Sequence, residues 1–174
     1  RLNHEAIAIF TELGLQGDLA LAWNNEGQVH KHLGQLDSAL VYYRRSLRLC
    51  EANDDTLGKA TAWYNLSDIA ARQGRRAEAF TDGWRSLALA TQVRNKVRVS
   101  EALLQLSDLH EQYGRPDSAL AYFKFYHQYG DSLNAVNRTE ALAIQQARLG
   151  AEVKDLRIRN LQNERSLQRA RTWG

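Results

Sequence analysis

The sequence predicts an all-α protein, a solenoid of antiparallel helix pairs followed by a long C-terminal helix. The main observation is an internal repeat with a period of 40 residues in a chain of 174. Small residues fall in register at that period, at Gly34, Gly74, Gly114 and at Ala39, Ala79, Ala119. Self-similarity at a fixed period of this size is typical of a solenoid, in which each unit packs only against its neighbours.

Each copy has the pattern of a helical hairpin. Gly34 follows a run of good helix formers, and glycine readily adopts the left-handed conformation that ends a helix. Asp37 places a negative charge near the start of the second helix, where the helix dipole favours it. Small residues at Gly27, Ser67 and Ser107 are expected to face the in-register alanines of the second helix. The helix pairs are expected at 19–33 with 36–53, 57–73 with 76–93, and 97–113 with 116–129.

The repeats divide the chain into two parts. Residues 1–133 form the array, with a partial repeat at 1–16 and full repeats at about 17–56, 57–96 and 97–133. Residues 134–174 are expected to form a capping helix that continues into a coiled-coil or linker helix. The chain begins at Arg1 in mid-pattern and contains no methionine. We therefore expect further repeats upstream in a longer protein.

The repeated residues resemble the tetratricopeptide repeat. The residues that carry the resemblance are Trp23, Gly27, Gly34, Ala39 and Tyr43, then Trp63, Leu66, Gly74 and Ala79, then Leu106, Gly114, Ala119 and Phe123. The usual period of that family is 34, so a period of 40 indicates a subgroup with lengthened helices. Glu26 and Gly83 depart from the pattern, which has leucine and an aromatic residue there. The resemblance implies a right-handed superhelical array that binds proteins or peptides.

A narrower resemblance lies at the junction 126–133. It is similar to the tetratricopeptide sensor region of Bacteroidetes-type membrane histidine kinases and regulators. That resemblance implies the sensory or scaffolding part of a larger bacterial signalling protein, which carries a kinase or DNA-binding output domain. The array would then be extracytoplasmic (periplasmic), and otherwise cytoplasmic. The chain has no apolar run of 18 residues, so contact with a membrane is expected only through flanking segments.

Composition excludes several classes of function. The net charge of +3 is concentrated in 148–174, where seven basic and three acidic residues give +4 and leave −1 for the rest. A near-neutral array argues against nucleic-acid binding. Cys50 is the only cysteine, which excludes an internal disulfide and a cysteine metal cluster. No histidine pair has zinc-site spacing and no glycine-rich phosphate loop is present. We expect no catalytic residue, metal or cofactor.

Polar side chains recur along the first helices, which line the groove of such an array. Asn25, Asn65 and Gln105 share one position, and Gln28, Asp68 and Asp108 lie three residues further on. Positions i and i+3 share a helix face, and an amide can both donate to and accept from a peptide backbone. The predicted groove also includes flanking residues, which are Asn24, Tyr64, Leu104, His32, Arg72 and Gln112. The alternative is that these amides bridge adjacent helices or face water.

The leading hypothesis is therefore a module that binds a protein or peptide, as an extended segment, in this groove. The alternative is a structural spacer or dimerisation segment without a peptide ligand. Seven residues follow alternating spacings of four and three across Leu149–Ala170, and five of them are apolar while Asn160 and Asn163 are not. This pattern is compatible with a homodimer through a coiled coil, in which a seam asparagine can fix the register. A single projecting helix remains the other interpretation of that segment.

Overall fold

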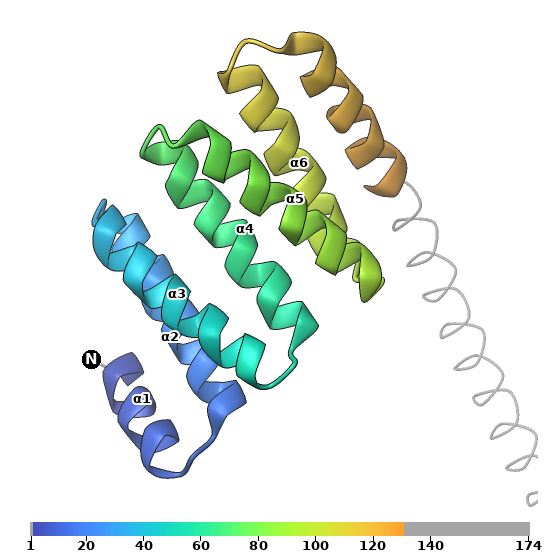
Figure 1. The fold of residues 1–174 in the computed structure, drawn as a ribbon. Helices are drawn as coiled ribbons and strands as arrows, with labels where there is room; N and C mark the ends of the chain where they lie inside the picture. The colour runs from blue at the N-terminus through green and yellow to red at the C-terminus, as the bar shows by residue number, and fades with distance from the viewer. Residues whose placement is uncertain (1, 131–174) are drawn as a thin grey trace, which may run out of the picture. The chain divides into compact units, whose positions relative to one another are not determined.

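The computed structural model describes residues 2–130, and this part of the chain is entirely helical with short turns (Figure 1). The helices are α1 (Leu2–Glu12), α2 (Gln16–His32), α3 (Leu36–Ala52), α4 (Thr56–Arg72), α5 (Arg76–Gln92) and α6 (Lys96–Gln112), followed by a helical stretch at 116–130. The predicted all-α solenoid is confirmed. The capping helix, the coiled coil and the dimer predicted for 134–174 lie outside the described residues.

The helices stack in the order of the sequence. Each helix from α1 to α6 packs against the next, and α2 also touches α4 as α4 touches α6. Figure 1 shows the resulting row of antiparallel hairpins. We call α2, α4 and α6 the first helices, and α3, α5 and 116–130 the second helices. The additional contacts mean that the first helices form one continuous layer.

The turns recur every 20 residues, and each places one residue in the left-handed conformation. Glycine supplies it at positions 14, 34, 74 and 114, whereas Asp54 (φ 52°) and Arg94 (φ 54°) supply it between the full hairpins. A left-handed residue with a side chain costs about 1–2 kcal/mol. At these two turns the next residue caps the following helix. Asp55 accepts from the Gly58 N–H at 2.9 Å, and Asn95 accepts from the Arg98 N–H at 3.0 Å. Each cap contributes about 1 kcal/mol, which offsets much of that cost.

Small residues on the first helices set the spacing within each hairpin. A Cβ atom at Gly27 would lie 2.6 Å from the ring of Tyr43, so the ring packs directly on the α2 backbone. In the next two hairpins the hydroxyl groups of Ser67 and Ser107 donate to the carbonyls of Ala79 and Ala119, at 2.7 and 2.8 Å. Ser67 and Ser107 therefore face the alanines as expected and add a hydrogen bond to the close approach, whereas Gly27 faces the ring of Tyr43.

The core runs between hairpins as well as within them. Tyr43 and Leu47 of α3 pack with Leu66 and Ile69 of α4 in one buried cluster. Gly83 lacks the aromatic ring that the repeat pattern has at this position. A Cβ atom there would lie 3.0 Å from a methyl group of Leu106. Leu106 of the following hairpin therefore occupies space that a side chain at position 83 would need.

His110 is a buried ionisable residue of this core. It is 5% exposed and lies against the rings of Phe80 and Tyr122, at centroid distances of 4.7 and 5.2 Å. Neither ring nitrogen has a hydrogen-bond partner within residues 2–130. Burial, followed by the charges of Arg115 and Arg76, lowers the pKa of His110. The side chain is therefore neutral at pH 7.

This burial makes stability depend on pH in a defined direction. Below the ordinary histidine pKa of about 6.5, the unfolded chain binds a proton that the folded chain resists. Stability therefore falls as pH drops from 7 through 6.5 toward the lowered pKa. Between pH 7 and pH 5.5, we expect the melting temperature of His110→Phe to fall by less than that of the wild type. Replacing the exposed His32 by phenylalanine serves as the control, and equal losses in all three proteins would contradict the prediction.

Candidate functional site

One pocket lies on the layer of first helices, at the C-terminal halves of α4 and α6. Its volume is about 380 Å³ and Lys31 of α2 closes one side. Seven residues of the predicted groove line it, and they are Tyr64, Asp68, Arg72, Leu104, Gln105, Asp108 and Gln112. The structure therefore brings together most of the predicted residues of the second and third hairpins.

Both basic and acidic side chains line this pocket. Asp68 accepts from Lys31 Nζ at 3.0 Å and from Arg72 Nε at 2.8 Å, so its carboxylate ties α2 to α4. Asp108 is exposed and has no ion pair among residues 2–130. Partial desolvation and the charge of Glu111 raise the pKa of Asp108. Burial raises the pKa of Tyr64, so its hydroxyl stays protonated at neutral pH and can donate. A ligand entering here meets both donors and acceptors.

The recurring amides connect neighbouring first helices. Asn65 Nδ2 of α4 donates to Asn24 Oδ1 of α2 at 2.8 Å, and both side chains are buried. Gln105 Nε2 of α6 donates to the Tyr64 carbonyl of α4 at 3.0 Å. The bridging alternative therefore describes the geometry of Asn24, Asn65 and Gln105. Their part in ligand binding stays a prediction, with one observation in its favour. Gln105 Oε1 is buried and has no hydrogen-bond partner in the described part of the chain.

A second pocket of about 530 Å³ lies between α2 and the N-terminal half of α4, with Ser46 and Cys50 of α3 also in its lining. Asn24, Asn25 and Gln28 of α2 line it, together with Leu21, Leu57 and Thr61. Arg98 of α6 also lines this pocket and pairs with Glu101 of the first pocket at 2.6 Å. We call the two adjoining pockets the trough.

The length of the trough follows from α4, whose residues line it from Leu57 to Arg72. Fifteen residue steps of α-helix correspond to about 22 Å. An extended peptide advances about 3.3 Å per residue. The trough therefore has room for roughly six or seven residues of an extended chain.

Some residues differ from the expected set. His32 is exposed and Asn65 is buried, and neither lines the two pockets. The sequence analysis missed Lys31, Arg98 and Glu101. Lys31 lies three positions after Gln28, and Glu101 lies four positions before Gln105. Because such positions share a helix face, the same periodicity could have identified both.

The described residues offer little for metal or redox chemistry. No group of three or more His, Cys, Asp or Glu side chains in residues 2–130 could hold a metal ion. Cys50 is a free, buried thiol whose pKa is raised, first by burial. In the same range no helix is long and apolar enough to cross a membrane.

Comparison with known proteins agrees with the helical-repeat geometry. The crystal structure of BtubC (BKLC) from P. vanneervenii matches with a TM-score of 0.67 and 20% sequence identity. The match covers 76% of this chain and 55% of that chain, so this chain spans about half the length of BtubC. No curated protein matches the sequence. The family model for the tetratricopeptide repeat matches residues 18–82 and 58–124, which together make up more than half of the chain. The chain therefore belongs to the tetratricopeptide repeat family.

Proposed function

We propose that the trough binds an extended peptide segment of a partner protein. Tetratricopeptide repeats are generally protein–protein interaction modules and are generally non-catalytic, so an interaction role is the family's common property. The peptide ligand and its location in the trough are our inference. The observation that carries the proposal is the 380 Å³ pocket, which seven of the twelve predicted groove residues line.

The chemistry of the trough suits a peptide backbone. An extended backbone offers alternating N–H and C=O groups, each of which needs a hydrogen-bond partner. Gln105 Oε1 is a buried acceptor without a partner in residues 2–130, and Asp108 is an exposed carboxylate beside it in the pocket. Tyr64 and Gln112 provide donors on the same surface. Leu104, which is partly exposed, supplies apolar contact area for the peptide's side chains.

A structural spacer is the second candidate function, and the Asn24–Asn65 pair favours it. That pair is buried and bonded between α2 and α4, so these two amides have a stacking role without any ligand. Asp68 and Gln105 also bond between first helices. Asp108 and Gln112 form no such bond within residues 2–130, and their position in the pocket favours the peptide. A sensory role within a larger signalling protein is supported by the resemblance of the 126–133 junction.

The proposal is tested with a displayed library of random linear dodecapeptides selected on the full chain. Selected peptides are titrated by calorimetry against the wild type and a trough variant, Asp108→Ala with Gln112→Ala. Both of these side chains are exposed and line the pocket. We expect at least tenfold weaker binding at an unchanged melting temperature, since tenfold corresponds to about 1.4 kcal/mol.

The matched control replaces an acid and an amide on the second helices, Glu51→Ala with Gln92→Ala. Both are exposed and neither lines the trough. Peptides that bind all three proteins with the same affinity would exclude the trough as their site. A selection that enriches no peptide over an unrelated helical protein would favour the spacer.

A further inference from the structure

The second hairpin departs from its neighbours at one aromatic position. In the first hairpin the ring of Tyr42 stacks on Trp23 at 5.5 Å and on His30 at 4.9 Å. In the third, Tyr122 stacks on His110 at 5.2 Å. The equivalent residue of the second hairpin, 40 positions from each tyrosine, is Asp82. Trp63 therefore lacks the stacked tyrosine that covers its counterpart Trp23.

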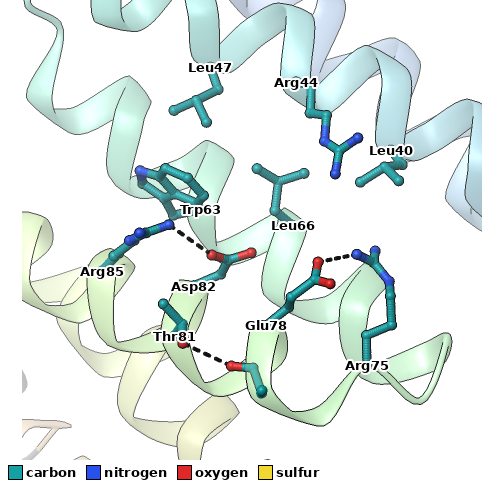
Figure 2. Close-up of a pocket in the computed structure, with 11 residues that line it drawn as sticks. Leu40, Arg44, Leu47, Trp63, Leu66, Arg75, Glu78, Thr81, Asp82 and Arg85 are labelled. Atoms are coloured by element: carbon teal, nitrogen blue, oxygen red, sulfur yellow. Dashed lines mark hydrogen bonds and ion pairs between the residues drawn. The ribbon is translucent and has the colours of Figure 1, made fainter.

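A pocket opens beside this position. It lies between the second helices α3 and α5, has a volume of about 360 Å³, and is lined at its base by Trp63 and Leu66 of α4 (Figure 2). Leu40 and Leu47 of α3 extend the apolar wall. None of its lining residues belongs to the trough. It is therefore a separate site on the other side of α4.

Two of the three arginines around this pocket form ion pairs, and the third forms none within residues 2–130. Arg75 pairs with Glu78, and Arg85 pairs with Asp82 at 3.4 Å while its guanidinium lies 4.6 Å from the ring centre of Trp63. Burial raises the pKa of Asp82. Arg44 lines the same pocket and is exposed, and it forms no ion pair within residues 2–130. In Figure 2 its guanidinium points toward Leu66 and the open space above Glu78. The pocket therefore has one uncompensated positive charge beside an apolar base.

We propose that this pocket is a second docking site, which receives an apolar side chain next to an acidic one from a partner protein. The apolar side chain rests on Trp63 and Leu40, which are partly exposed, and the neighbouring carboxylate pairs with Arg44. Tyr42 shows the kind of ring that this fold places on the equivalent tryptophan. The unpaired guanidinium favours a carboxylate over an ammonium group, because the three arginines exceed the two carboxylates of the pocket by one charge.

The probe is an array of acetylated and amidated octapeptides in which Asp or Glu adjoins Phe, Tyr, Trp or Leu. Each peptide has one counterpart with the acid replaced by its amide and another with the apolar residue replaced by serine. The full chain is applied as wild type, Arg44→Glu and Arg48→Glu. Arg48 is exposed on the same helix and does not line the pocket, so it controls for the change in net charge.

We expect Arg44→Glu to bind the acid-containing peptides at least tenfold more weakly than the wild type does. Arg48→Glu should bind them with the affinity of the wild type. Both counterpart peptides should bind the wild type at least tenfold more weakly. Asp82→Tyr restores the residue of the other hairpins, and it should abolish binding while the melting temperature holds or rises. The indole N–H resonance of Trp63 should shift when the peptide is added.

Three results would overturn the proposal. One is equal loss of binding in the Arg44 and Arg48 variants, and another is a wild type that binds no peptide of the array. The third is loss of binding in the trough variant Asp108→Ala with Gln112→Ala while Arg44→Glu binds normally, because those peptides would then occupy the trough. Since the two sites share no lining residue, failure of this proposal leaves the trough proposal standing.

Discussion

Replacing Tyr43 by alanine is expected to lower the free energy of unfolding by about 3–5 kcal/mol, the usual cost of removing a buried aromatic ring. Tyr43 has no exposed surface and packs on Gly27 of α2 and within the cluster shared by α3 and α4. Its loss therefore weakens both the first hairpin and its contact with the second. Urea unfolding followed by circular dichroism measures the change.

A second substitution, Tyr43→Phe, distinguishes the contribution of the ring from that of the hydroxyl group. Tyr43 Oη is buried without a partner in residues 2–130, and burial holds its pKa well above the usual range. Removing an unsatisfied buried polar group while keeping the ring can be neutral or stabilising. Tyr43→Phe should therefore be at least as stable as the wild type. A large loss in this variant would show that the hydroxyl contributes a bond, and a small loss in Tyr43→Ala would contradict the packing role.

The second large effect is expected at the buried amide pair. Asn65→Ala should cost about 1–3 kcal/mol, because the Asn24 amide is then left buried without its partner. Asn24→Ala should cost a similar amount. The double substitution should cost less than the sum of the two, because the second change removes a group that is already unpaired. Thermal and urea unfolding of the wild type, the two single variants and the double variant gives the four stabilities of this double-mutant cycle.

The same variants decide what the recurring amides do. If Asn65→Ala lowers stability and leaves the affinity for a selected peptide unchanged, the pair serves to stack α2 on α4. If the affinity falls by more than the stability change explains, Asn65 also supports the trough. Strictly additive effects in the cycle would contradict the direct bond between the two side chains.

Much of the fold could be predicted because its determinants are local and repeated. The glycines at 34, 74 and 114 mark the turns within hairpins, and each has positive φ in the structure. The turns at Asp54 and Arg94 carry no such signal, since their side chains disfavour the conformation that they adopt. Asp55 and Asn95, which cap the following helices, are the signal that could have placed these turns.

The candidate site was predicted in part for a related reason. Periodicity gathers Tyr64, Asp68, Gln105 and Asp108 on one face of the first helices, and in the structure these four residues line one pocket. It cannot separate Asn25, which is exposed, from Asn65, which is buried, although both occupy the same position of the repeat. The difference depends on which side chain the neighbouring helix covers, and that is a property of the stack.

The sequence by itself determined the helices and their pairing, because the glycine turns and the 3.6-residue periodicity act within a single repeat. Only the tertiary structure decided that Asn65 bonds to Asn24, that Leu106 fills the space beside Gly83, and that a pocket opens where Asp82 replaces a tyrosine. Each of these depends on how closely one hairpin approaches the next. That distance is set by the side chains of two repeats together, and no single repeat encodes it.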